Sequence, residues 1–252
     1  MLFIIFFMLF IIFFNMNKIS FCAFLCAACF LIACGDGLSN DKSSSRVKTE
    51  SSSSKKIVAS SSTSVSSIAQ KNVDPSTVTK GSIKDARDGQ SYKTVTIGSQ
   101  TWMAQNLNYE TAKGYCYKNK TSNCSKYGRL YTWAAAKTAC PSGWHLPTKA
   151  EFETLFAAGG GQLTVGAKLK SKSGWYKSGN GFDEYSFSAL PVAYSNFKTS
   201  YYGEGLFAFF WSSTEESDDN AFYMKLFYDY DKVFLYYDDK NAFMSVRCVK
   251  DD

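Results

Sequence analysis

Cysteine and histidine are the residue types that most often act as nucleophile, base or metal ligand, and this chain has eight cysteines but a single histidine. A catalytic group of the Ser-His-Asp or Cys-His kind needs an imidazole, so it would have to use His145. His145 lies between Trp144 and Leu146, just before a predicted helix, and we interpret it as a structural side chain that hydrogen-bonds the backbone. Gly159-Gly160-Gly161 follows a helix pattern and so does not suit a phosphate loop. We therefore predict a protein that is not an enzyme.

The N-terminal segment contains a motif for covalent lipid attachment. Leu31-Ile32-Ala33-Cys34 closes an apolar run that begins after Lys18, and it resembles the bacterial lipobox, where a peptidase cuts before a lipid-carrying cysteine. We predict a signal peptide over residues 1–33, with Met16 as a candidate start, and a lipidated Cys34 as membrane anchor. The alternative is an uncleaved N-terminal anchor. Either interpretation places the remainder outside the cytoplasm, and the lipobox favours the cell envelope, at the outer membrane or cell surface.

The predicted cleavage before Cys34 also divides the other cysteines into two groups. Three lie in the predicted signal peptide, which leaves Cys116, Cys124, Cys140 and Cys248, an even number in an oxidising compartment. Sequence alone leaves their pairing open. We favour Cys116–Cys124, which closes a short loop, and Cys140–Cys248, which ties the middle of the domain to its last strand. Zinc is the alternative, but these four cysteines contain no CxxC pair.

Oxygen ligands for a hard cation could come from one acidic segment, which contains Glu215, Glu216, Asp218 and Asp219. A solvated acidic loop is the favoured interpretation, so we expect no cofactor, with calcium as the less favoured alternative. Residues 81–252 hold twenty basic and eighteen acidic side chains, and no Lys/Arg cluster forms a phosphate-tracking face. We therefore expect no nucleic-acid partner.

Composition divides the chain sharply near Gly81. Residues 34–80 hold the predicted lipid site and then a serine-rich segment, which cannot bury enough apolar area to fold and is predicted to be a flexible stalk. All five tryptophans and all sixteen tyrosines lie beyond Gly81. Residues 81–252 are therefore predicted to form one folded domain.

The element pattern of this domain predicts an α+β fold with two helices and a small antiparallel sheet. One helix is expected over the alanine-rich residues 130–139. The second begins with a capping box formed by Thr148 and Glu151. Alternation in the last strand points Cys248 inward and Arg247 to the opposite face. The expected strands cover residues 91–97, 101–103, 185–190, 207–211, 221–228, 233–237 and 243–249.

Residues 162–210 are predicted to be mostly irregular, and several aromatic residues there sit among Gly, Ser, Asn and Lys. Exposed aromatic rings give a large contact area at little entropic cost, so they suit a sugar face or a protein partner. The alternative is that they belong to the core, as we expect for Phe207, Phe209, Phe210 and Trp211. The candidate ligand-binding residues are Trp175, Tyr176, Tyr194, Tyr201 and Tyr202.

Six ordered motifs between residues 85 and 251 resemble one family, the Fibrobacter succinogenes major paralogous domain of bacterial surface and secreted proteins. The first residues of the six motifs are, in order, Asp88-Gly89-Gln90-Ser91-Tyr92, Gln100-Thr101-Trp102-Met103-Ala104-Gln105-Asn106-Leu107, Tyr127-Gly128-Arg129-Leu130-Tyr131, Cys140-Pro141-Ser142-Gly143-Trp144-His145, Phe210-Trp211-Ser212-Ser213 and Ser245-Val246-Arg247-Cys248. This family is similar in fold to the C-type lectin-like domain. The resemblance therefore implies two helices, a long irregular loop region and a terminal hairpin sheet, with Cys140–Cys248 as the long disulfide.

Fold resemblance alone does not assign a function. The calcium-dependent sugar-binding motifs of true lectins do not occur here, and the oxidase-like branch of the fold would need a reactive thiol at Cys116 or Cys124. We therefore predict a non-enzymatic binding or adhesion module whose ligand is a polysaccharide or a surface protein. The alternatives are a structural or assembly protein of the envelope and, more remotely, an oxidase-like enzyme.

Overall fold

The computed structural model describes residues 72–197 and 200–252, so the predicted signal peptide, Cys34 and most of the serine-rich segment lie outside the described residues. The described α-helices are α2 (Thr121–Tyr127), α3 (Trp133–Ala139), α4 (Lys149–Ala158) and α5 (Val165–Leu169). None of them is both long and apolar enough to cross a membrane. The described strands are β1 (Thr79–Lys84), β2 (Ser91–Ile97), β3 (Gln100–Met103), β4 (Gly114–Cys116), β5 (Arg129–Tyr131), β6 (Trp144–His145), β7 (Tyr194–Phe197), β8 (Ser200–Tyr202), β9 (Phe207–Glu215), β10 (Asn220–Phe227), β11 (Val233–Asp239) and β12 (Val249–Lys250).

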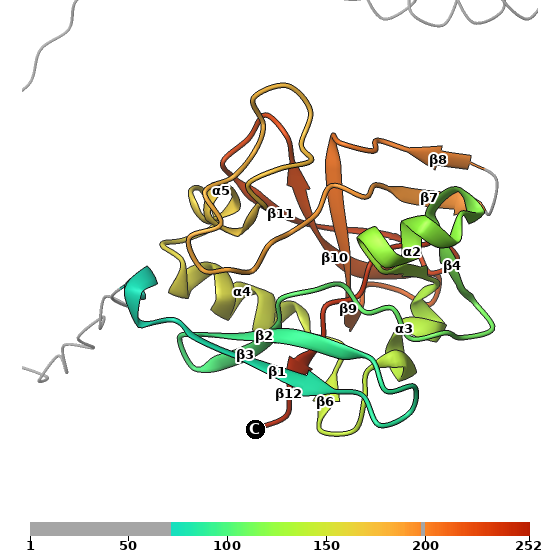
Figure 1. Cartoon of the computed structure of the whole chain (residues 1–252). Coiled ribbons are helices and arrows are strands. Elements are labelled where there is room, and N and C mark those ends of the chain that lie inside the picture. Colours follow the sequence, from blue (N-terminus) through green and yellow to red (C-terminus); the bar gives the residue numbers. More distant parts are fainter. Residues whose placement is uncertain (1–71, 198–199) are drawn as a thin grey trace, which may run out of the picture. The chain divides into compact units, whose positions relative to one another are not determined.

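A five-stranded antiparallel sheet in the order β1-β2-β3-β12-β6 forms the lower layer in Figure 1. The fold extends upstream of Gly81, where the composition changes. Val73 donates its N–H to the carbonyl of Ala158 at 2.8 Å and packs against the core, and β1 already begins at Thr79. The side chains of β1 are mostly exposed, so this edge strand carries no apolar signal that sequence analysis could detect.

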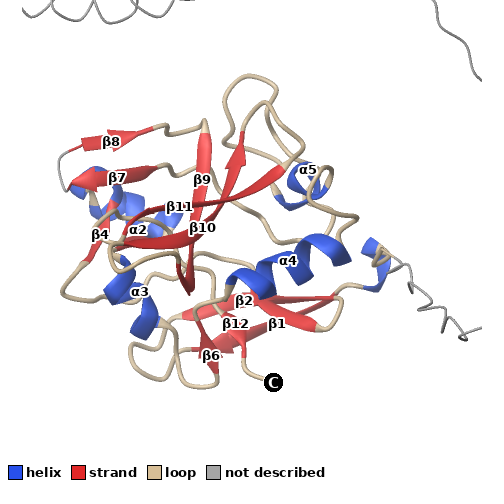
Figure 2. Ribbon diagram, turned by 180° about the vertical axis from the view of Figure 1, so that it is seen from behind, coloured by secondary structure: helices blue, strands red, loops and turns tan. Residues whose placement is uncertain are grey.

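Strands β9, β10 and β11 form a three-stranded antiparallel meander. Strand β10 pairs with β11 from Asn220↔Asp239 to Leu226↔Val233, which places the predicted turn at residues 229–232. The β7–β8 hairpin lies beside β9, as both ribbon views show (Figures 1 and 2), and the rings of Tyr194 and Phe209 are 4.7 Å apart.

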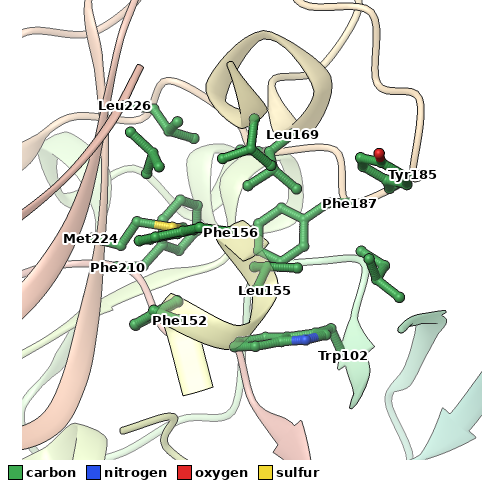
Figure 3. Close-up of a cluster of buried hydrophobic side chains, with 14 of the residues drawn as sticks. Trp102, Phe152, Leu155, Phe156, Leu169, Tyr185, Phe187, Phe210, Met224 and Leu226 are labelled. Atoms are coloured by element: carbon green, nitrogen blue, oxygen red, sulfur yellow. The ribbon is translucent and has the colours of Figure 1, made fainter. Parts of the chain in front are cut away.

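Helix α4 lies between the five-stranded sheet and the meander (Figure 2) and joins their cores. The predicted capping box at its start is present: the backbone N–H of Thr148 donates to Glu151 Oε2, and the backbone N–H of Glu151 donates to Thr148 Oγ1. The rings of Phe152 and Trp102 are stacked, with 5.4 Å between their centroids (Figure 3). The other labelled residues of this buried cluster are Leu155, Phe156, Leu169, Tyr185, Phe187, Phe210, Met224 and Leu226.

The prediction of an α+β fold is confirmed, but the prediction of two helices is wrong, because the described residues contain four. Helix α2 begins inside the loop that the Cys116–Cys124 disulfide closes and continues past Cys124 to Tyr127, and α5 has only five residues. The predicted helix over residues 130–139 begins three residues late. Tyr131 instead extends β5 and exchanges backbone hydrogen bonds with Met244, and Thr132 then caps α3.

Two strand predictions are also wrong. No strand forms over residues 185–190, because Ser186 and Ser188 have φ values of 56° and 53°, in the left-handed region that breaks a strand. The last segment does not extend the meander either. Residues 243–248 form only isolated bridges, to Tyr131, Ser195 and Phe210, before the chain enters the other sheet as β12.

The expected disulfides, Cys116–Cys124 and Cys140–Cys248, are both present. Cys248 points inward as predicted, and the opposite face, to which we assigned Arg247, does not meet solvent either. The segment passes between layers, so both of its faces are buried, and Arg247 has no exposed surface. A two-residue alternation marks opposite faces of a strand but does not show whether either face meets solvent.

Candidate functional site

One face of the meander carries a continuous set of aromatic rings, which we call the aromatic face. Alternate residues of an antiparallel strand share a face, so this set follows directly from the strand registers. The opposite face, with Ala208, Phe210, Met224 and Leu226, packs on α4. The aromatic face is defined here as Phe207 and Phe209 from β9, Tyr223, Lys225 and Phe227 from β10, and Phe234 and Tyr236 from β11. Trp211, which is opposite Tyr223, shares this side of the meander but is fully buried in a second core cluster.

Ring contacts connect these residues across all three strands. Phe227 lies 5.3 Å from Phe207 and 5.2 Å from Phe234 between ring centroids. Phe234 and Tyr236 are stacked at 5.5 Å, with an angle of 6° between their planes. Because each ring is supported by its neighbours, the set forms a preorganised surface that loses little side-chain entropy on binding.

Exposure changes across this surface. Phe209 and Tyr223 are buried at its base, whereas Tyr236 is 43% exposed and the remaining rings are partly exposed. Burial raises the pKa of the Tyr223 hydroxyl, so this group stays protonated at neutral pH. The surface therefore offers contact area to a partner.

Lys225 lies in the middle of the aromatic face, between Tyr223 and Phe227 along β10. Its Nζ is 4.6 Å from the ring centre of Phe207, 4.9 Å from Phe209 and 4.4 Å from Phe227. These distances are typical of cation–π contacts. Burial lowers the pKa of the Lys225 ammonium, and the charge of Asp238 acts in the opposite direction.

Two of the five aromatic residues expected from sequence border this face. Tyr202 is 53% exposed and lies 6.2 Å from Tyr194, whose ring contacts Phe209. The β7–β8 hairpin thus extends the aromatic face beyond β9. Tyr230, 49% exposed in the β10–β11 turn, borders it elsewhere and lies 5.5 Å from Phe227.

The other three expected residues lie elsewhere. Trp175 is only 5% exposed, which corrects the expectation that it binds ligand; its Nε1 donates to Ser171 Oγ and to the Ala189 carbonyl. Tyr201 is half-buried, with its ring 5.0 Å from Tyr117 in a separate cluster. Tyr176 is exposed and contacts Tyr228.

Sequence reasoning assigned Phe207 and Phe209 to the core. Phe209 is buried, but both rings belong to the aromatic face, and Phe207 is partly exposed. The signal that could have found this surface is the even-numbered spacing of rings, two residues apart at 207/209 and 234/236 and four residues apart at 223/227. That spacing groups the rings but does not show whether the group faces the core or solvent.

The acidic segment after β9 surrounds a cation that belongs to the chain itself. Lys240 Nζ donates to Glu215 Oε2 at 2.7 Å, to the Ser217 carbonyl at 2.8 Å and to the Asp218 carbonyl at 2.7 Å. Lys240 lowers the pKa of Glu215 through this hydrogen bond. Across the described ranges, no three His, Cys, Asp or Glu side chains are grouped to hold a metal ion. The Lys240 ammonium therefore lies where the oxygen atoms of this loop would otherwise surround a cation.

His145 contacts carboxylates and not the backbone carbonyl that we expected of its ring. Its Nδ1 lies 2.6 Å from Asp251 Oδ1, and its Nε2 lies 2.7 Å from Glu151 Oε1. Burial lowers the pKa of His145, both hydrogen bonds raise it, and the net result is above the ordinary value of 6.5. The ring therefore connects the end of the chain to the capping box of α4, which is a structural role.

A polar pocket of about 280 Å³ beside α2 is a weaker candidate site. Several of its polar groups are bonded within the domain: Asn108 Nδ2 donates to Gln90 Oε1 at 3.0 Å, and Gln105 Oε1 accepts from the Lys93 backbone N–H at 2.7 Å. Asn108 Oδ1 is buried without a hydrogen-bond partner among the described residues. Cys124 also lines this pocket, but its sulfur is bonded to Cys116. The pocket therefore presents no free thiol from this pair for redox chemistry.

The fold and the aromatic face define a disulfide-bonded α+β domain with one ring-lined sheet face. Comparison with known families is more specific. The Fibrobacter succinogenes major domain matches residues 95–250, which is more than half of the chain. The chain therefore belongs to this family. No curated protein and no solved structure matches it.

Proposed function

We propose that this protein is a non-enzymatic binding module that attaches to a polysaccharide through the aromatic face. The observation that carries this proposal is the group of partly exposed rings on the meander, Phe207, Phe227 and Phe234, which continues into the exposed Tyr236 and is bordered by the exposed Tyr202 and Tyr230. Grouped aromatic rings that are left accessible to solvent are typical of interaction sites. The flat C–H faces of pyranose rings are suited to stacking on such aromatic rings.

The structural setting supports a binding role over a catalytic one. His145 is held by two carboxylates, and Cys116 and Cys124 are bonded to each other. The oxidase-like alternative would need a free thiol at one of these two positions. We also propose that the domain adopts the lectin-like form of the α+β fold, which the irregular region between α5 and β7 and the Cys140–Cys248 bond support.

The lipobox completes the proposal at the level of the cell. Lipidation at Cys34 would tether the chain to an envelope membrane, and the serine-rich segment would act as a spacer. A flexible coil of some 46 residues has a root-mean-square reach of roughly 35–40 Å. This reach is enough to present the aromatic face to material outside the membrane surface. Labelling with a radioactive fatty acid, lost in Cys34→Ser, tests the anchor.

The β11 strand offers a matched pair of variants to test the binding surface. Tyr236 faces the aromatic face, whereas its neighbour Tyr237, 56% exposed, points to the opposite side and contacts Phe222. We expect Tyr236→Ala with Tyr202→Ala to reduce pull-down of the full-length chain on polysaccharides about tenfold or more. Tyr237→Ala should leave it unchanged. Equal retention of all three proteins would contradict the proposal and favour the structural alternative.

A further inference from the structure

Building on the proposed binding function, we propose that the ligand of the aromatic face is an anionic polysaccharide and that Lys225 recognises its carboxylate groups. The juxtaposition behind this inference is an ammonium framed by three rings, with no carboxylate of the described residues within ion-pair distance of it. Ring faces provide the contact with sugar rings, and the ammonium provides the charge selectivity.

Lys225 differs from the partly or fully buried lysines Lys168, Lys170 and Lys240. Lys240 is bonded to Glu215, Lys168 pairs with Glu184 at 3.7 Å, and Lys170 donates to three backbone carbonyls. Lys225 makes no hydrogen bond or ion pair with any residue that the structure describes; its contacts are ring faces. Asp238 is the carboxylate on the same face, and it lies beyond ion-pair distance of Lys225.

The physical reason for an external anion is desolvation. An ammonium that is partly removed from water loses hydration energy, and cation–π contacts recover only part of it. A ligand carboxylate at this point would form a charge-assisted hydrogen bond in a surrounding of low polarity, where such a bond is strong. The site therefore favours a bound anion over a neutral group of the same shape.

Uronic acid polymers combine the two features that this surface offers to bind. Each sugar ring has an apolar C–H face that can stack on an aromatic ring, and each carries a carboxylate at its edge. A single framed ammonium does not form the row of charges that follows a nucleic-acid backbone. An acidic peptide would pair with the Lys225 ammonium but would not stack on the ring surface, so polyglutamate is a suitable control polymer.

The test compares polygalacturonate with its fully methyl-esterified form, which has the same backbone without the charge. We expect the full-length chain to bind polygalacturonate about five- to tenfold more tightly at low salt, as one charge-assisted contact predicts. Lys225→Met keeps the apolar stem and should abolish this preference. Lys225→Arg keeps the charge and should retain most of it. Binding is measured by affinity electrophoresis or calorimetry.

The outcomes separate this inference from the function on which it rests. If Lys225→Met retains the full preference for the charged polymer, the role of Lys225 is overturned while polysaccharide binding stands. If polyglutamate binds as tightly as polygalacturonate with the same dependence on Lys225, the partner is an acidic peptide and the inference is wrong. Loss of binding to both polymers in Tyr236→Ala with Tyr202→Ala, but not in Tyr237→Ala, supports the underlying site.

Discussion

At the scale of single residues, Arg247 is a buried charge in the core of the domain. The guanidinium is fully buried without a carboxylate in contact, and burial lowers its pKa to about 9, with the charge of Asp183 opposing the shift. It stays cationic at neutral pH because acceptors surround it. Its N–H groups donate to Asn106 Oδ1 at 2.7 Å, to the Met103 carbonyl at 3.2 Å, to the Phe187 carbonyl and to the Ser188 carbonyl at 2.9 Å.

At the same scale, His145 predicts a pH-dependent contribution to stability. Its folded pKa lies above the ordinary 6.5, so the contribution is complete below that value and is lost as the pH rises through the folded pKa. The neutral ring can donate only one hydrogen bond, whereas the imidazolium donates one to each carboxylate. The side chain is 39% exposed, so solvent screening limits the gain to about 1 kcal/mol.

We expect His145→Gln to lower the free energy of unfolding relative to wild type at about pH 6 and to make little difference at about pH 9. Urea denaturation at both pH values measures this. Glu153→Gln is the matched control, because Glu153 lies on α4 but pairs with Lys149 and not with His145. A stability difference that is the same at both pH values would contradict the assignment.

At the scale of elements, lysine side chains connect the loops to the strands. Lys170 Nζ donates to the carbonyls of Phe227, Tyr228 and Tyr230 at 3.1–3.2 Å, which joins the segment after α5 to the end of β10. Burial lowers the pKa of Lys170. Lys240 does the same for the segment between β9 and β10. Both ammonium groups donate hydrogen bonds to oxygen atoms that would otherwise be left to water.

This arrangement predicts that the loops do not depend on calcium. Neither calcium nor a chelator should shift the Tm of the wild-type chain, because Lys240 occupies the position among the loop oxygens. Lys240→Met should lower Tm by a few degrees, since three acceptors lose their donor. Lys232→Met is the control, as this exposed lysine makes no side-chain hydrogen bond or ion pair with any described residue. Scanning calorimetry measures the Tm. A rise in the wild-type Tm on addition of calcium would refute the assignment of Lys240 as the cation of this loop.

At the scale of the whole molecule, the two disulfides act over very different distances along the chain. Cys140–Cys248 spans 108 residues and joins the end of α3 to the segment before β12, whereas Cys116–Cys124 spans 8 residues. On the loop-entropy model, the long bond contributes about 4.7 kcal/mol and the short one about 2.5 kcal/mol.

Cys140→Ala with Cys248→Ala should therefore lower the free energy of unfolding by about 3–5 kcal/mol, more than Cys116→Ala with Cys124→Ala. Alanine avoids placing a hydroxyl in the buried site of Cys248. Urea denaturation of both double variants against wild type gives the comparison. An equal or larger loss from the short-loop variant would show that local packing around α2, and not chain entropy, determines the effect.

Sequence by itself determined the fold class, the family, the even number of cysteines available for disulfides, the capping box of α4 and the strands of the meander. These features follow from local spacing or from cysteine number, which the chain carries whatever its neighbours are. Only the tertiary structure decided that Trp175 is buried, that Arg247 lies in the core and that Lys240 fills the acidic loop. It also decided which side of the meander packs on α4, and so which rings remain for a partner. Burial depends on what the rest of the chain places against a residue, and a two-residue alternation cannot contain that information.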